Sequence, residues 1–234
     1  MQTLVRENLS DKLARIIGRQ IIQNELKSGE IVYETKISKE WGVSRSPVRD
    51  ALRMLEQIRL VERTSSGSYK VSEMSEEYIR HFYEIINLFY PYVFTKAAEN
   101  ATKKDIRELS KAMTEIVRCL ETRDFEAYLK GVTRYASEVL RIAGNPIVEK
   151  IVVELMPTAE RVQYASLSFL PAKFESIVGY LHDSFLAIEN KDPETASAIF
   201  GQFALIHLEL NLQSARSVVN EKKQRVVKRR KKIS

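Results

Sequence analysis

The sequence predicts a mainly α-helical protein in which a short β-hairpin lies between two groups of helices. Glycine and proline are few, at 8 and 6 of 234 residues, which favours long helices over a fold with many turns. Apolar residues recur at helical spacing over most of the chain, whereas residues 60–71 contain two short strand-like runs. A hydrophobic share of 44% is enough for a packed core.

The first helices are expected near the N-terminus. Apolar residues at helical spacing predict a helix over 6–26, which ends at a Ser-Gly pair. Residues 35–41 fit a second, short helix with Ile37 and Trp41 turned inward. The Gly-Val-Ser sequence at 42–44 then predicts a tight turn.

A third helix and a hairpin complete this region. Ser46 followed by Pro47 fits an N-cap with proline at the first helical position, and the helix would run to about residue 57. The runs 60–63 and 69–71 surround a Ser- and Gly-rich turn and predict a β-hairpin. Helix, helix, tight turn, helix and hairpin is the order of a winged helix-turn-helix domain, here residues 1–74.

The pattern from residue 75 to about 220 is helical almost throughout. Gly, Pro, Asn, Asp and Thr mark breaks at 100–102, 122–124, 144–146, 169–171 and 190–193. Five breaks predict an all-α bundle of six or seven helices as a second domain, residues 75–220. The last segment, 221–234, has no apolar face to pack, and a disordered tail is expected there.

Charge is distributed unevenly along the chain. Residues 1–72 hold 13 Lys/Arg and 9 Asp/Glu, residues 73–220 hold 16 and 21, and residues 221–234 hold 8 and 1. Basic ends around an acidic middle indicate a polyanionic partner for the ends and another task for the middle. The tail would either add non-specific phosphate contacts or remain a solvated run of charge.

Several classes of protein are disfavoured. The single cysteine, Cys119, allows no internal disulfide framework, and with three histidines it allows no Cys-rich zinc module. The longest nearly apolar run, 85–94, is too short to span a bilayer, and the N-terminus does not resemble a signal peptide. No nucleophile–base pair, paired carboxylates or glycine-rich phosphate loop indicates an enzyme. A cytoplasmic protein without a cofactor or membrane partner is expected.

The third predicted helix has two distinct faces. Its apolar residues recur at i, i+3, i+4 and i+7 and should be buried: Val48, Ala51, Leu52 and Leu55. Arg45, Arg49 and Arg53 are spaced by four and fall on one other face. That face is either an ordinary solvated surface or a surface that enters a DNA groove, where arginine can grip guanine or phosphate. The tight turn before the helix and the hairpin after it favour DNA.

Residues 34–71, ETKISKEWGVSRSPVRDALRMLEQIRLVERTSSGSYKV, resemble the N-terminal domain of GntR-type bacterial transcriptional regulators. The helical domain resembles that of the FadR-like branch, an FCD-type effector domain, through AGNP at 143–146 and Ala187-Ile188 followed by Asp192. The likeness covers about residues 6–215. It implies contacts with operator DNA from Thr35, Lys36, Arg45, Ser46, Arg49, Arg53, Gly67 and Ser68. One departure is Arg59, where the family commonly has a glycine that can adopt positive φ.

The resemblance also bears on the second domain. Many FadR-like regulators bind a metal there through one Asp and three His, and those positions fall on Val132, Ala136, Leu181 and Phe203, none of which can bind a metal. No metal site is therefore expected. Family members often have an Arg that holds a carboxylate effector, and its position falls on Ile86 in this sequence. The position of a Glu one turn later falls on Tyr90. The expected effector-lining residues are Ile86, Tyr90, Val132, Tyr135, Ala136, Leu181, His182 and Phe203.

These observations predict a homodimeric repressor that binds a near-palindromic operator. Its helical domain would sense a small apolar, acyl or aromatic effector without a metal. The alternative is an effector-independent DNA-binding factor in which side chains fill the bundle and that domain only dimerises.

Overall fold

The computed structural model describes the backbone of residues 8–230. The chain divides into two compact units. One contains the residues up to Met74 together with Glu154–Tyr164, and the other contains Ser75–Val153 and the residues from Ala165 onward. The expected boundary near residue 74 is thus where the contacts change, although a segment of one later helix groups with the first unit.

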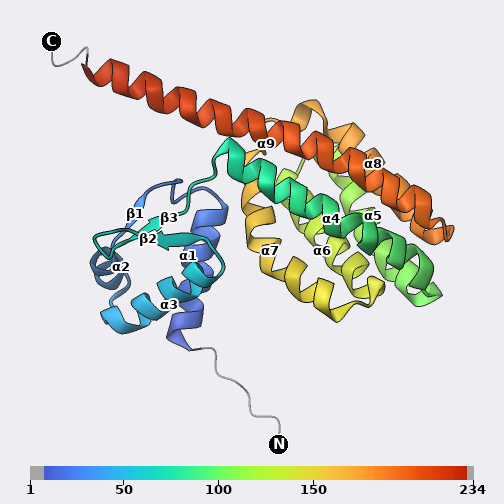
Figure 1. Ribbon diagram of the computed structural model, residues 1–234, viewed down its shortest axis with the longest axis horizontal. Helices are drawn as coiled ribbons and strands as arrows, with labels where there is room; N and C mark the ends of the chain where they lie inside the picture. Colours follow the sequence, from blue (N-terminus) through green and yellow to red (C-terminus); the bar gives the residue numbers. More distant parts are fainter. Residues whose placement is uncertain (1–7, 231–234) are drawn as a thin grey trace, which may run out of the picture. The chain divides into compact units, whose positions relative to one another are not determined.

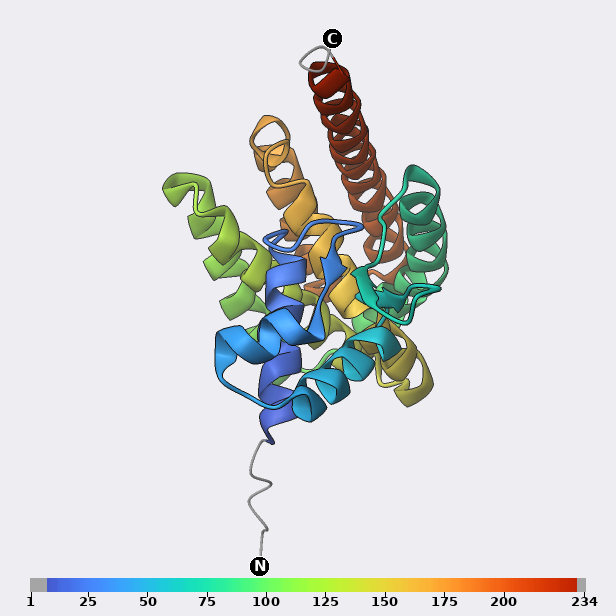
Figure 2. The ribbon, with the colours of Figure 1, turned by 90° about the vertical axis from the view of Figure 1, so that its left-hand side faces the viewer.

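The first unit is a three-helix domain with a small sheet. Its elements are α1 (Leu9–Ile22), β1 (Ile31–Val32), α2 (Glu34–Trp41), α3 (Arg45–Gln57), β2 (Val61–Arg63) and β3 (Tyr69–Val71). The three strands are antiparallel in the order β1-β3-β2, with Val61 opposite Val71 and Val32 opposite Tyr69. Figure 2 shows the helices in blue to cyan and the hairpin in teal. This is the predicted winged helix-turn-helix arrangement, with one additional short strand, β1.

A single apolar core holds this unit together. Leu13, Ile17 and Ile21 of α1 pack with the buried face of α3 and with Tyr69 and Val71 of β3. Burying a leucine or isoleucine side chain contributes about 1.5–3 kcal/mol, so these contacts fix α3 firmly on the domain. Its opposite face is left to solvent.

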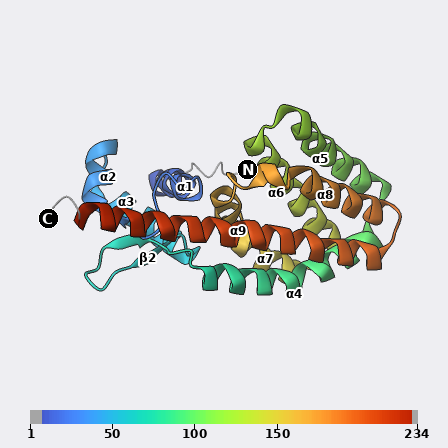
Figure 3. The same ribbon diagram turned by 90° about the horizontal axis from the view of Figure 1, so that it is seen from above.

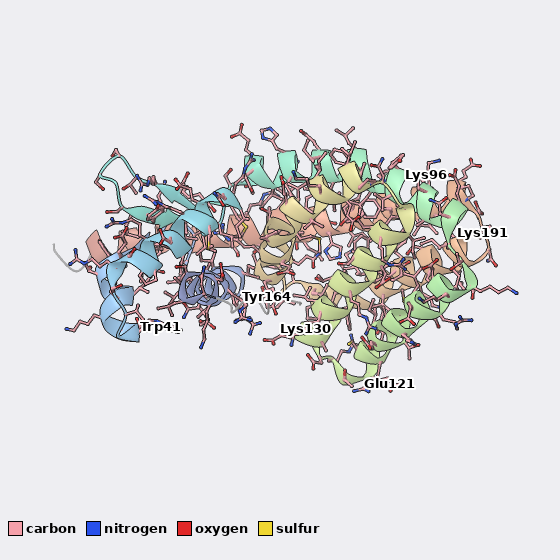
Figure 4. The ribbon with its side chains drawn as sticks, turned by 90° about the horizontal axis from the view of Figure 1, so that it is seen from below. Trp41, Lys96, Glu121, Lys130, Tyr164 and Lys191 are labelled. Carbon is pink, nitrogen blue, oxygen red and sulfur yellow. The ribbon has the colours of Figure 1, made fainter. Side chains whose placement is uncertain are left out.

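Three local expectations differ from the structure. The first helix, expected over 6–26, ends at Ile22 with Gln23 as its C-cap. The third helix begins at Arg45 with Ser44 as its N-cap, so Pro47 occupies the third helical position. Proline is tolerated there because the first N–H groups of a helix have no intrahelical partner. Trp41, expected to face inward, is 40% exposed at the C-terminal end of α2 (Figure 4). Ile37 does pack against the core.

The second unit is an all-α bundle. Its helices are α4 (Glu76–Asn100), α5 (Lys103–Thr122), α6 (Phe125–Ala143), the first part of α7 (Pro146–Ala165), α8 (Phe174–Glu189) and α9 (Pro193–Arg230), with a 3₁₀ turn at Leu170–Ala172. The helix α4 lies along α9 and also packs on α6, and α8 packs on α5 and α9 (Figures 1 and 3). Six α-helices in this range confirm the predicted bundle, and every predicted break separates two elements.

Polar caps explain several helix starts. Ser75, Thr102 and Asp124 each accept a hydrogen bond from a backbone N–H in the first turn of α4, α5 and α6. Asn8 does the same for α1. Such caps satisfy N–H groups that have no intrahelical partner and contribute about 1 kcal/mol each.

The C-terminal segment differs from the expectation of a disordered tail. The backbone of α9 continues as helix through residue 230, because neither glycine nor proline follows Gly201 in that helix. The rest of the predicted tail, 231–234, lies outside the described residues. Within the part of the chain that the structure describes, no helix is long and apolar enough to cross a membrane.

Candidate nucleic-acid interface and helical core

The outer face of α3 carries the predicted arginines. Arg45, Ser46, Arg49 and Arg53 are all exposed, whereas Val48, Ala51, Leu52 and Leu55 are at most 2% exposed. The side chain of Arg53 pairs with Asp50 one turn earlier, at 3.6 Å. The core therefore anchors one side of the helix and presents a polar, largely cationic strip on the other.

The start of α2 and the turn after it lie next to α3 in the chain and in space. Thr35 and Lys36 are exposed in the first turn of α2. Gly42 ends that helix with a φ of 64°, a left-handed conformation that glycine adopts without steric cost. Its N–H donates to the carbonyl of Ser38, as does the N–H of Val43 at 3.0 Å. These bonds set the tight turn of the helix-turn-helix.

Arg49 is held by an acidic partner that the sequence analysis did not identify. Its Nε donates to Oε1 of Glu34 at 3.2 Å and its Nη2 donates to Oε2 at 3.0 Å. The hydrogen bond and charge of Glu34 raise the pKa of Arg49. Glu34 is the first residue of α2, so this bidentate pair ties the orientation of an α3 arginine to α2.

The wing is a compact turn between β2 and β3. The N–H of Thr64 donates to the carbonyl of Ser68 at 2.8 Å, and the N–H of Gly67 donates to the carbonyl of Thr64 at 2.9 Å. Gly67 has a φ of 82° and open space where a side chain would stand. Gly67 is exposed and Ser68 is half-buried. The turn therefore presents bare backbone at its tip, which allows close approach of another molecule.

Two basic residues flank the wing. Arg63 lies over the ring of Tyr69, 5.3 Å from Cζ to the ring centroid, and its Nε donates to the Tyr69 hydroxyl at 3.3 Å. The hydrogen bond and the electrostatic interaction with the Tyr69 hydroxyl raise the pKa of Arg63. Lys70 pairs with Glu62 across the hairpin at 3.0 Å. These cations stay charged and stand on fixed strands.

Arg59 keeps the backbone geometry that the family usually gives to glycine. Its φ is 59°, so the turn from α3 into β2 is preserved with a residue that pays a steric cost. Its N–H donates to the carbonyl of Glu56, and its own carbonyl accepts a hydrogen bond from the Ser72 hydroxyl at 2.7 Å.

Most of the expected effector-lining residues lie inside the bundle. Ile86, Tyr90, Val132, Tyr135 and Leu181 are buried, and Ala136 and Phe203 are half-buried. His182 instead stands on the outside, with a side chain 48% exposed and Nδ1 at 4.0 Å from Asp183. The next residue along a helix points about 100° away, so His182 turns outward where its neighbour Leu181 turns inward.

Aromatic rings and two polar pairs fill much of this interior. The ring of Tyr90 stacks on that of Phe200 with centroids 4.7 Å apart, and burial raises the pKa of Tyr90 to about 12. The hydroxyls of Tyr135 and Ser184 lie 2.9 Å apart, and Asn211 donates to the Tyr83 hydroxyl at 3.0 Å.

His207 is an interior residue that was not among the expected effector-lining positions. It is 3% exposed, and its ring lies 4.4 Å from that of Phe203. Burial lowers its pKa to about 4, so the imidazole is neutral at physiological pH. The periodicity of α9 carried the signal, because residues 200, 204 and 207 share one helical face. Among the described residues, no three His, Cys, Asp or Glu side chains gather as a metal site would require.

Two family models match the chain. Residues 9–71 match the model described as bacterial regulatory proteins of the gntR family, and residues 81–204 match the FCD domain. The chain belongs to the GntR family. It combines a GntR DNA-binding domain with an FCD domain, and the regulators of this family are DNA-binding transcription factors rather than enzymes.

Similar proteins agree with this assignment. The chain is 24% identical over 185 residues to the gluconate operon transcriptional repressor of Bacillus subtilis, covering 77% of this chain and 76% of that protein. It is 23% identical over 214 residues to the transcriptional repressor RspR of Escherichia coli, covering 91% of each. Among solved structures, the E. coli McbR/YncC protein shares its fold with a TM-score of 0.73 at 19% identity, over 88% of this chain and 98% of that one.

Family membership gives the exposed face of α3 a context. In this GntR-family protein, the winged helix-turn-helix unit presents the predicted arginines and the wing tip to solvent, as a DNA-binding surface requires. The structure also reveals two residues of this surface that the sequence did not predict. Glu34 and Tyr69 hold two of the basic side chains, and neither stands at a spacing within one helix that would have revealed the contact.

Proposed function

We propose that this GntR-family regulator is a FadR-like repressor that binds its operator as a homodimer and responds to a small effector without a metal. The exposed arginine face of α3, fixed by the buried face behind it, carries the DNA-binding part of the proposal. A recognition helix placed in the major groove reads base edges, while neighbouring elements grip phosphates. The protein would act in the cytoplasm, where bacterial DNA lies.

Each predicted contact residue has a role in this arrangement. Arg45 and Arg49 would read base edges, since both stand in the first part of α3. Phosphate contacts would come from α2, from the wing and from the rest of α3: Thr35, Lys36, Ser46, Arg53, Gly67 and Ser68. Phosphate contacts position the protein but carry no sequence information, so the specificity of binding would rest on the two arginines.

A homodimer is supported by an apolar patch on the bundle. Ile85, Leu88 and Tyr92 are exposed on one face of α4, and Ile147 is exposed at the start of α7. Asn145 joins the two helices, since its Nδ2 donates to the Tyr92 hydroxyl at 2.9 Å. Leu88 and Ile147 are 71% and 72% exposed, which is unusual for large apolar side chains. A second copy of the patch would bury this apolar surface.

The effector part rests on the composition of the bundle interior. The positions where many FadR-like proteins have metal ligands hold Val132, Ala136, Leu181 and Phe203. Two relatives are named for the gluconate and galactonate operons, and gluconate and galactonate are carboxylate anions. We expect the effector of this chain to differ from these compounds. An interior without ligating groups at those positions fits an apolar, acyl or aromatic effector better than a metal-chelated carboxylate.

The first test selects the operator and then measures how many chains bind to it. DNA fragments would be selected from a random pool with the full chain, and the mass of the complex would be measured by sedimentation. We expect one near-palindromic sequence bound by two chains. A set of unrelated fragments, or one chain per site, would contradict the proposal.

The dimer face has its own variant. Leu88→Glu places a charge in the apolar patch and should convert the protein to a monomer. Leu205→Glu is the matched control, because Leu205 is 62% exposed on α9, outside the patch. If Leu88→Glu remained a dimer, or if both variants dissociated equally, the α4 face would not be the interface.

A further inference from the structure

The second unit buries polar side chains but, among its described residues, no charged one. Besides several tyrosines, its buried polar residues are Ser166, Ser184, His207, Asn211 and Ser214. Ser184, Asn211 and Ser214 make hydrogen bonds inside the bundle. Charged side chains labelled in Figure 4, such as Lys96, Lys130 and Lys191, lie on the outside of the bundle. The interior is therefore polar in places but neutral.

Within the part of the chain that the structure describes, two buried polar side chains of this interior have no hydrogen-bond partner. They are His207, through both Nδ1 and Nε2, and Tyr128, through its hydroxyl. Tyr128 is fully buried, and His207 is 3% exposed. A buried donor or acceptor that has no partner lowers the stability of a fold, so its retention calls for a functional explanation.

The unpartnered groups belong to two helices that pack against the same third helix, α4. Tyr128 lies on α6 and His207 on α9, and α4 packs against both of these helices. Asn211, one turn after His207, donates to the Tyr83 hydroxyl of α4. Burial raises the pKa of Tyr128, and the Tyr83 phenol adds to that rise. We call these four residues, Tyr83, Tyr128, His207 and Asn211, the polar cluster.

An aromatic wall stands beside the polar cluster. The ring of Phe203 lies 4.4 Å from the imidazole of His207 and 6.1 Å from the ring of Phe200. Phe200 stacks on Tyr90, one of the positions expected to line the effector site. The surroundings of His207 therefore combine flat apolar surface with hydrogen-bonding groups, which is the composition typical of small-molecule sites.

We propose that the polar cluster binds the effector through His207 and that the recognised group is uncharged. This inference rests on the proposed effector response and specifies its chemistry. A neutral imidazole offers one N–H donor and one acceptor nitrogen, and the phenols can donate or accept. A hydroxyl or carboxamide on an aromatic or aliphatic body complements such groups. A carboxylate would be buried without a cationic partner among the buried side chains that the structure describes in this unit, at a large cost in desolvation.

The test compares neutral and anionic probes of equal shape on the full chain. Benzamide and benzoate form one pair, and octanamide and octanoate form another, each added at millimolar concentration. Binding is measured by titration calorimetry and by the ¹⁵N shifts of the His207 ring. We expect at least one amide to bind and to move the His207 signals, and its carboxylate partner to bind at least tenfold more weakly.

Two variants locate the site. His207→Phe keeps a ring against Phe203 but removes both nitrogens, and it should weaken amide binding at least tenfold. His182→Phe changes the exposed histidine and should leave binding unchanged. Equal or tighter binding of the carboxylates, an unchanged affinity in His207→Phe, or no binding of either amide would overturn the inference.

Operator affinity measured in parallel separates this inference from the function on which it rests. If a carboxylate probe lowered operator affinity equally in the wild type and in His207→Phe, the effector response would stand and the role of His207 would be overturned. An amide that bound at His207 without altering operator affinity would support the site and refute the effector response. A ligand changes DNA affinity only through its different affinity for the two states.

Discussion

At the scale of single residues, the contact between Glu34 and Arg49 fixes the side chain of an exposed arginine on α3. Glu34 occupies the Nε–Nη2 edge of the guanidinium, and the terminal edge stays available for guanine or phosphate. The pair fixes the direction of that edge and partly neutralises its charge. Glu34 should therefore favour specific over non-specific binding.

Glu34→Gln tests this role. The variant should bind random DNA more tightly, with a slope of log affinity against log salt steeper by about 1, and discriminate the operator less well. Both quantities come from fluorescence anisotropy titrations at several salt concentrations. Glu62→Gln is the control, because it removes an equal charge from the pair with Lys70 and leaves Arg49 untouched. An equal loss of specificity in both variants would mean that charge alone matters.

Arg59 carries a steric cost that a smaller residue should relieve. Its φ of 59° is a left-handed conformation that disfavours any side chain with a Cβ. Arg59→Gly should therefore raise the free energy of unfolding of the first unit by about 1 kcal/mol, measured by urea denaturation. The same substitution inside α3, Arg53→Gly, should lower it by about 1 kcal/mol. A destabilised Arg59→Gly variant would show that contacts of the arginine outweigh the strain.

At the scale of elements, the start of α5 depends on one carboxylate. Oδ2 of Asp105 accepts hydrogen bonds from the N–H of Thr102 at 2.9 Å and from its hydroxyl at 2.6 Å, and Oδ1 accepts one from Arg141 at 2.6 Å. The Arg141 and Thr102 bonds hold the pKa of Asp105 well below its usual range. This pair also links α5 to α6.

Asp105→Asn should destabilise the bundle by about 1–2 kcal/mol at neutral pH. The folded-state pKa is depressed, so the contribution of Asp105 is fully present above its unfolded pKa of about 4 and is lost as pH falls below it. The gap in stability between the wild type and Asp105→Asn, measured by thermal denaturation from pH 7 downward, should thus shrink in acid. Asp183→Asn, on an exposed side chain, should show no such gap. A gap that stayed constant with pH would contradict this.

The elements also show how far sequence reasoning reaches. Apolar periodicity and helix-breaking residues predicted every helix of the bundle. Such signals can be read from the sequence because they are local: Thr102 and Asp124, for example, cap helices through bonds to residues only three positions away. The two-residue strand β1 escaped notice, since Ile31-Val32 is too short for any period to register. Contacts such as Asn211 with Tyr83, 128 positions apart, depend on packing that no local pattern records.

Over the full chain, the sequence is basic at both ends and acidic in the middle. The DNA-binding unit carries the cationic face of α3, and the helical unit buries neutral groups only, among its described residues. The strongest positive charge, however, lies in residues 221–234, which hold 8 Lys/Arg against 1 Asp/Glu.

Removing residues 221–234 tests what that charge contributes. If the segment adds phosphate contacts, the truncated chain should show a flatter slope of log affinity against log salt while it selects the same operator. Anisotropy titrations on operator and random DNA provide both results. An unchanged slope would leave the segment without a part in DNA binding, and an altered sequence preference would give it a part in recognition.

We expect the exposed arginine face of α3 to read the operator, and Arg49→Ala is the variant that decides whether it does. The measurement is the ratio of affinities for selected operator and random DNA, at one salt concentration, for the wild type and the variant. We predict that the ratio falls by about tenfold or more, since a bidentate arginine–guanine contact discriminates by about 1–3 kcal/mol, while helical content and oligomeric state stay unchanged. A variant that kept the wild-type ratio would contradict the assignment of Arg49 as a base-reading residue.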